Sequence, residues 1–73
     1  MTIPLSVNGE ETTAAEGVTV AELVREKARG VRDRKGRGVA VAVNGEVVPR
    51  SGWESAVLHP GDRIELLDAV GGG

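Results

Sequence analysis

The sequence contains no cysteine, and Trp53 is its only aromatic residue. Without cysteine the chain can form no disulfide and offers no thiol nucleophile, which is typical of proteins in a reducing compartment. Since His59 is the only histidine, no zinc site built from nitrogen and sulfur ligands is expected. A chain of 73 residues, 40% of them hydrophobic, must therefore fold around a small aliphatic core.

The sequence also lacks an apolar run of about 20 residues, the length needed to cross a membrane. Its first residues show no basic region followed by an apolar stretch, as an export signal would. These absences predict a soluble, cytoplasmic protein with no membrane partner.

Positive charge is scarce outside one segment. Seven of the nine basic residues lie between positions 25 and 37, although the net charge is −2. Glycines at 30, 36 and 38 interrupt this segment and no aromatic residue accompanies it. A solvated helix end and loop is therefore favoured over a nucleic-acid-binding surface.

No combination of side chains predicts a catalytic site. His59 lies in an expected turn, Ser51 has no base in a recognisable arrangement, and segment 30–38 lacks phosphate-loop spacing. Asp62 and Glu65 are expected on opposite faces of a strand, which disfavours a carboxylate pair. The sequence therefore predicts a protein that is not an enzyme and binds no metal or cofactor itself.

Periodicity and turn signals predict the order β-β-α-β-β-β. The expected elements are strands at 2–7 and 10–14, a helix at 20–29, strands at 39–43 and 46–49, a turn or short helical segment at 51–58, and a strand at 63–70. Asn-Gly pairs at 8–9 and 44–45 suit tight hairpin turns. Thr19 and Glu22 have the spacing of a helix capping box. Alternating valine and alanine at 39–43 suits a central strand covered on one side by the helix.

One helix with a single apolar stripe must pack across one face of a sheet. The predicted fold is therefore an α+β roll with a mixed sheet of four to five strands and one main helix, the β-grasp or ubiquitin-like architecture. Residues 1–70 are expected to form this single domain, and 71–73 a flexible C-terminal glycine tail.

The tail Gly71-Gly72-Gly73 has two interpretations. It could be a frayed terminus, or its α-carboxylate could be the reactive group of a chain without a side-chain catalyst. Glycine has no Cβ, so the backbone can pass through a narrow channel. An ionised carboxylate is a poor electrophile, so an activating enzyme would have to form an acyl-adenylate from ATP. A sulfur nucleophile would then give a thiocarboxylate, and a lysine amine would give an isopeptide.

Several stretches together resemble a known family: Val-Asn-Gly-Glu at 7–10, Thr-Val-Ala-Glu-Leu-Val at 19–24, residues 39–50, Trp53, Gly-Asp-Arg-Ile-Glu at 61–65, and Ala69-Val70 with the glycine tail. They resemble the ThiS family of sulfur carriers in thiamine biosynthesis, within the ThiS/MoaD group of ubiquitin-like proteins. Nearly the whole chain takes part in the resemblance.

The resemblance implies a sulfur carrier in which Gly73 is the modified residue and Gly71 and Gly72 thread into a partner. A ThiF-type enzyme would adenylate the carboxylate with ATP. A sulfur-relay donor of the cysteine desulfurase or rhodanese type would convert it to a thiocarboxylate. A ThiG-type thiazole synthase would accept the sulfur.

Strand alternation places Leu67 and Ala69 on the face opposite Ile64, where they could contact a partner enzyme beside the tail. Asp62 and Asp68 could pair with basic residues of that partner. Alternatively, a helix or an adjacent segment covers both faces.

Other functions stay open at this point. The molybdopterin-synthase small subunit, MoaD, shares the fold and the tail chemistry but typically has a proline near its glycines, whereas residues 67–70 here are Leu-Asp-Ala-Val. Carriers for cysteine or for sulfur-containing natural products, a ubiquitin-like modifier conjugated through Gly73, and a plain interaction domain are the remaining alternatives.

Overall fold

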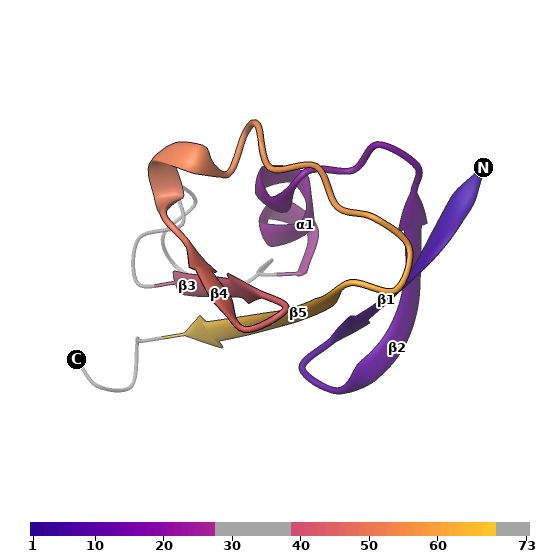
Figure 1. Ribbon diagram of the computed structural model, residues 1–73, viewed down its shortest axis with the longest axis horizontal. Coiled ribbons are helices and arrows are strands. Elements are labelled where there is room, and N and C mark those ends of the chain that lie inside the picture. The colour runs from indigo at the N-terminus through magenta and orange to yellow at the C-terminus, as the bar shows by residue number, and fades with distance from the viewer. Residues whose placement is uncertain (28–38, 69–73) are drawn as a thin grey trace.

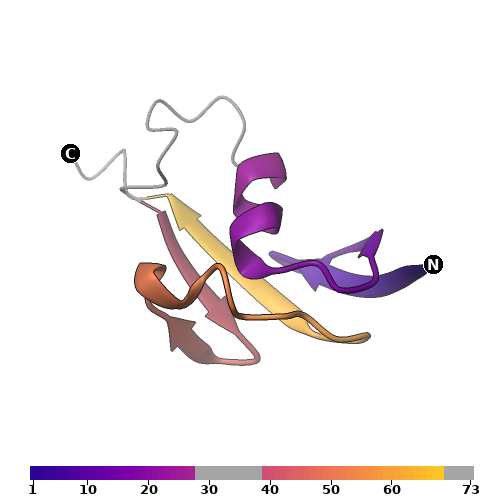
Figure 2. The same cartoon turned by 90° about the horizontal axis from the view of Figure 1, so that it is seen from above.

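The computed structural model describes residues 1–27 and 39–68, which form one mixed sheet with one α-helix across a face (Figures 1 and 2). The elements are β1 (Thr2–Val7), β2 (Glu10–Ala15), α1 (Val20–Lys27), β3 (Val39–Val43), β4 (Glu46–Val48), a 3-10 helix η1 (Arg50–Gly52) and β5 (Arg63–Asp68). The predicted order β-β-α-β-β-β is confirmed. Positions 28–29 of the predicted helix, the basic segment up to 38, positions 69–70 of the predicted last strand and the glycine tail lie outside the described residues.

The sheet has the strand order β2-β1-β5-β3-β4. β5 pairs parallel with β1 and antiparallel with β3, which makes the sheet mixed. The expectation that 39–43 forms a central strand is confirmed, because β3 pairs with β5 on one side and with the edge strand β4 on the other, while β5 is the middle strand of the five. The small side chains of β3 suit this inner position. β5, with six residues, pairs on one side of β3, and β4, with three residues, pairs on the other.

Both predicted hairpins have the expected Asn-Gly turns. Asn8 and Asn44 each have φ 52°, and Gly9 and Gly45 have φ 84° and 86°. Two successive positive φ angles are the mark of a type I′ turn, whose twist matches that of the strands it joins. The turns therefore set the registers of β1 with β2 and of β3 with β4.

The predicted capping box at the start of α1 is confirmed. The Glu22 backbone N–H donates to Thr19 Oγ1 at 3.2 Å, and the Thr19 N–H donates to Glu22 Oε1 at 3.1 Å. Two further N–H groups of the first turn donate to the segment after η1, Val20 to the Ala56 carbonyl and Ala21 to the Trp53 carbonyl. The free donors of a helix N-terminus are thus satisfied, and the segment is bound to the helix.

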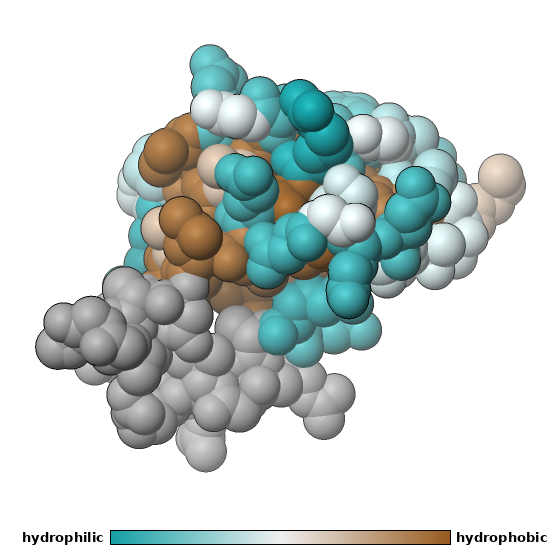
Figure 3. All heavy atoms as spheres, turned by 90° about the horizontal axis from the view of Figure 1, so that it is seen from below, coloured by the Kyte–Doolittle hydropathy of each residue, from teal (hydrophilic) through white to brown (hydrophobic). Residues whose placement is uncertain are grey.

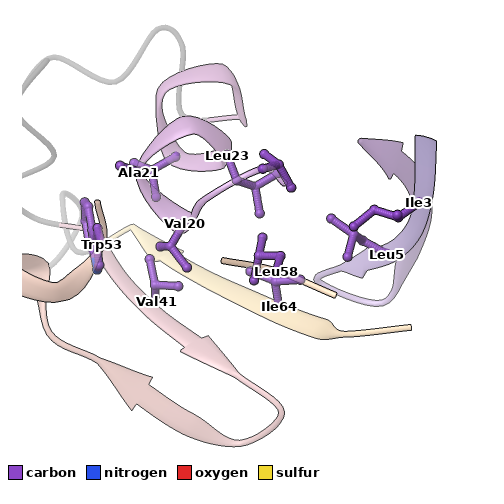
Figure 4. Packing of buried hydrophobic residues seen from close by; sticks show 11 residues of the cluster. Ile3, Leu5, Val20, Ala21, Leu23, Val41, Trp53, Leu58 and Ile64 are labelled. Carbon is purple, nitrogen blue, oxygen red and sulfur yellow. The ribbon is translucent and has the colours of Figure 1, made fainter. Parts of the chain in front are cut away.

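The core lies between α1 and the sheet (Figure 4). Its buried members are aliphatic apart from one indole: Ile3, Leu5, Val18, Val20, Ala21, Leu23, Val24, Val41, Trp53, Leu58 and Ile64. Trp53 lies over the core as predicted, and its Nε1–H donates to the Val48 carbonyl at 2.9 Å. No helix within residues 1–27 and 39–68 has the length and apolarity needed to span a membrane.

Candidate functional site

β5 is the strand that leads to the C-terminal glycines, and its two faces differ. Ile64 is 1% exposed and points into the core, whereas Leu67 is 65% exposed on the other face. The predicted placement of Leu67 opposite Ile64 is confirmed, and neither α1 nor another described segment covers it. Ala69 and the tail residues Gly71, Gly72 and Gly73 lie outside the described residues.

Leu67 belongs to an apolar patch on the face of the sheet that points away from α1. In the strand register Leu67 lies opposite Ala40, and Ala42 lies opposite Val47. Val47 is 76% exposed, a large fraction for a side chain of this size. We call Leu67, Ala40, Ala42 and Val47 the open-face patch. Figure 3, which views the molecule from the side opposite α1, shows the hydrophobic surface gathered toward the β3–β4 side.

The other half of the same face has more polar side chains and no large aliphatic one. β1 and β2 contribute Pro4 opposite Thr13 and Ser6 opposite Glu11, on the face that the buried Ile3 and Leu5 do not occupy. The large exposed apolar side chains of this face, Leu67 and Val47, therefore lie on the half formed by β3, β4 and β5, where Glu65 is a charged neighbour opposite Ala42. Val47 was not predicted to be part of this surface, although the alternation within 46–48 was a signal for it.

Asp62 is held inside the fold instead of standing free for a partner. One carboxylate oxygen accepts from the His59 backbone N–H at 2.8 Å, and the other accepts from Asn44 Nδ2–H at 3.0 Å. The side chain is only 15% exposed. Its bonds organise the turn before β5, so it is a poorer candidate for a partner contact than Leu67. Asp68 pairs through its backbone with Val39 at the end of β5.

Titratable side chains form no second site in the part of the chain that the structure describes. His59 is exposed, and its Nδ1 lies 4.0 Å from Asp62 Oδ2. Within that part no group of three His, Asp or Glu residues could hold a metal ion, and no polar or charged residue is buried.

The sequence match with known proteins includes the glycine tail. The profile of the ThiS family matches residues 4–73 of this chain. The chain belongs to the ThiS family. The predicted resemblance is thereby confirmed, and this ThiS-family chain has its last glycine, Gly73, inside the matched range.

Relatives agree in sequence and in fold. The sulfur carrier protein ThiS of Escherichia coli K12 is 33% identical over 66 residues, which are 90% of this chain and 92% of the relative. The crystal structure of the thiamine biosynthesis protein ThiS from Geobacter metallireducens is similar with a TM-score of 0.75 at 36% identity, covering 97% of this chain and 100% of that one. The predicted β-grasp fold of this ThiS-family chain is thus confirmed.

A third relative is much longer. A thiazole synthase of Paramagnetospirillum magneticum is 39% identical over 69 residues, which are 94% of this ThiS-family chain. The chain spans only 20% of the length of that relative. A segment similar to this chain therefore occurs within a polypeptide named as a thiazole synthase.

Proposed function

We propose that this chain is a sulfur carrier of thiamine biosynthesis and that its working group is the C-terminal carboxylate of Gly73. The supporting observation is the ThiS-family match, which runs through the whole glycine tail to residue 73. The described residues add a small domain whose central strand, β5, is the last element in the described part of the chain before that tail. Gly71 and Gly72 are the residues that would thread into a partner, because they have no Cβ to obstruct a narrow channel.

The chemistry needs activation by another protein. A ThiF-type enzyme would join the Gly73 carboxylate to the α-phosphate of ATP and release pyrophosphate. The resulting acyl-adenylate carries AMP as a good leaving group. A persulfide on a cysteine desulfurase or rhodanese-type relay would then attack the carbonyl and displace AMP, which gives an acyl disulfide. A thiol of the relay would cleave its S–S bond, forming a disulfide with the relay cysteine and releasing the thiocarboxylate. ATP is a substrate of the activating enzyme in this scheme, and the carrier serves as a protein cosubstrate.

The sulfur acceptor in this proposal is a ThiG-type thiazole synthase. The relative from P. magneticum supports it, since a similar segment lies within a protein of that name. The carrier has to present its C-terminus first to the activating enzyme and then to the thiazole synthase. Binding each of them in a fixed orientation requires a contact surface on the carrier.

The open-face patch is our candidate for the surface that contacts the activating enzyme and, afterwards, the thiazole synthase. Leu67 and Val47 are large, exposed and apolar. In the described part of the chain, only Asp68 follows Leu67. Apolar side chains that gather in one part of a surface mark interaction sites more often than scattered ones do. Ala69 would extend the patch by strand alternation. The same alternation assigns Asp68 to the other face of β5, so a charged contact between Asp68 and the partner stays a prediction separate from the patch.

Intact-protein mass spectrometry tests the proposed function. The purified chain is incubated with its activating enzyme, ATP and a sulfur donor, and it should gain the mass of one oxygen-to-sulfur exchange. Omitting ATP is the matched control and should leave the mass unchanged. An unchanged mass with an activating enzyme that thiocarboxylates another ThiS-family carrier would contradict the proposal. A ladder of covalent adducts stable to thiol reductants would instead support a protein modifier.

A further inference from the structure

The last residues of β5 are held unequally from their two sides. On one side β3 pairs with β5 from Val43 with Ile64 to Val39 with Asp68, the last residue of the strand. On the other side β1 pairs only through Ser6 with Arg63 and Val7 with Ile64. β1 then turns away into its hairpin, so the backbone groups of Leu66 on that side have no strand residue opposite them.

The side chain of Asn8 occupies this position. Its Oδ1 accepts from the Leu66 backbone N–H at 2.9 Å, and its Nδ2–H donates to the Leu66 carbonyl at 3.3 Å. The Asn8 backbone N–H donates to the Ile64 carbonyl at 2.9 Å. A carboxamide has the same donor and acceptor as a peptide group, so Asn8 continues the ladder by one step after β1 has ended.

Asn44, in the other Asn-Gly turn, makes an equivalent set of bonds at the opposite end of β5. Its Oδ1 accepts from the Arg63 N–H at 2.9 Å, and its backbone N–H donates to the Arg63 carbonyl at 2.7 Å. Its Nδ2–H donates to Asp62 Oδ1 at 3.0 Å. The two asparagines therefore clamp the beginning and the end of the same strand.

We propose that Asn8 is a positioning residue for the reaction at the C-terminus, and this rests on the proposed sulfur-carrier function. Leu66 lies seven residues before Gly73. By holding the backbone of Leu66, Asn8 fixes the direction in which β5 ends. The residues that follow then start within a narrower range of directions. Less conformational freedom then has to be lost when the carboxylate enters the active site of the activating enzyme. Asn44 holds the far end of the strand and has no such effect.

Asparagine also suits a positive φ for local reasons, so the turn and the clamp must be separated. Asn8→Gly does this, because glycine adopts φ 52° without strain but has no carboxamide. Asn44→Gly is the matched control, with the same turn and the same number of side-chain bonds lost at the other end of β5. Asn8→Asp keeps an acceptor for the Leu66 N–H and loses the donor to its carbonyl.

The first measurement is amide hydrogen exchange in the free protein. Exchange at the Leu66 N–H should be several-fold faster in Asn8→Gly than in the natural chain. Exchange at the Leu67 N–H, on the β3 side of the strand, should change little. In Asn44→Gly the faster amide should be that of Arg63. An unchanged Leu66 amide in Asn8→Gly would overturn the clamp.

The second measurement is single-turnover adenylation with saturating activating enzyme, beside the affinity of the two proteins. For an exposed pair of hydrogen bonds we expect Asn8→Gly to lower the maximal rate about two- to fivefold. Affinity should stay within about twofold, because the open-face patch is intact. Asn8→Asp should fall between Asn8→Gly and the natural chain. Asn44→Gly should keep the natural maximal rate, since a loss of stability alone does not change the rate of molecules that are folded and bound.

Equal maximal rates for Asn8→Gly and Asn44→Gly would overturn the positioning role. If the natural chain itself is never adenylated by a competent enzyme, the proposed function fails and the positioning role fails with it, while hydrogen exchange still decides whether Asn8 clamps β5. The two failures are therefore distinguishable.

Discussion

Ile64 and Leu67 lie three positions apart on β5 and face different surroundings. Ile64 is buried against α1 and β3, so its contribution is to the free energy of unfolding. Leu67 leaves most of its side chain in water, which no gain in the stability of the free domain explains. Alternation along a strand thus separates a residue that stabilises the fold from one that is available to a partner.

Leu67→Asp should separate folding from docking. We expect the free energy of unfolding to change by less than about 1 kcal/mol, because an exposed side chain makes few contacts to lose. Binding to the activating enzyme should weaken at least about tenfold, since a charge would then be buried in an apolar contact. Surface plasmon resonance with the activating enzyme measures the binding, and urea denaturation measures the free energy of unfolding.

The matched control for this change is Thr13→Asp, which adds the same charge to the polar half of the same face. It should leave binding within about twofold of the natural chain. Normal adenylation kinetics in a folded Leu67→Asp variant would count against the open-face patch as the docking surface.

At the scale of elements, the two hairpins depend on glycines that have positive φ. Gly45 has φ 86°, and a Cβ built there would meet no atom within 4 Å. Any cost of a larger residue at this position is therefore conformational and not steric crowding by neighbours. Gly52, in η1, has equally open surroundings without a positive φ.

Gly45→Ala should lower the free energy of unfolding by about 1–2 kcal/mol, the cost of a left-handed conformation for a residue with a Cβ. Gly52→Ala should be neutral or stabilising by up to about 1 kcal/mol, because it restricts the unfolded chain. Urea denaturation followed by circular dichroism measures both. Equal effects of the two substitutions would mean that the turn geometry does not determine the cost.

At the scale of the whole molecule, the core and the proposed working group belong to different parts of the chain. The core cluster and the side chains packed against it extend from Ile3 to Leu66 among the described residues. The carboxylate that we propose as the working group lies beyond this cluster, at residue 73. Substitutions in the core should therefore lower the free energy of unfolding, whereas changes to the tail should affect only the proposed function.

Deleting Gly71, Gly72 and Gly73 should leave the free energy of unfolding within about 0.5 kcal/mol of the natural value. Thiocarboxylate formation should be lost completely, while the variant should still compete with the natural chain for the activating enzyme through the open-face patch. Trp53 fluorescence during denaturation and a competition assay measure these outcomes. Sulfur transfer by the shortened chain would contradict the assignment to Gly73.

The features that could be predicted from the sequence each depend on residues that lie close together in the chain. The capping box needs only Thr19 and Glu22, three residues apart, and each Asn-Gly turn needs two adjacent residues. The side of β5 on which Leu67 lies follows from alternation alone. Residue chemistry over a few positions is enough for such features, because the interactions that decide them are local.

The sequence by itself determined the element order, the turns, the helix start and the family, each from local chemistry or from a match along the chain. Only the tertiary structure placed β5 at the centre of the sheet, Val47 on the same patch as Leu67, and Asn8 against Leu66, 58 residues away. Asp62 looked available from sequence, and its real partners come from a turn and from a hairpin 18 residues earlier. These features depend on which distant strands pair, and that is decided by burying one shared core between α1 and the sheet.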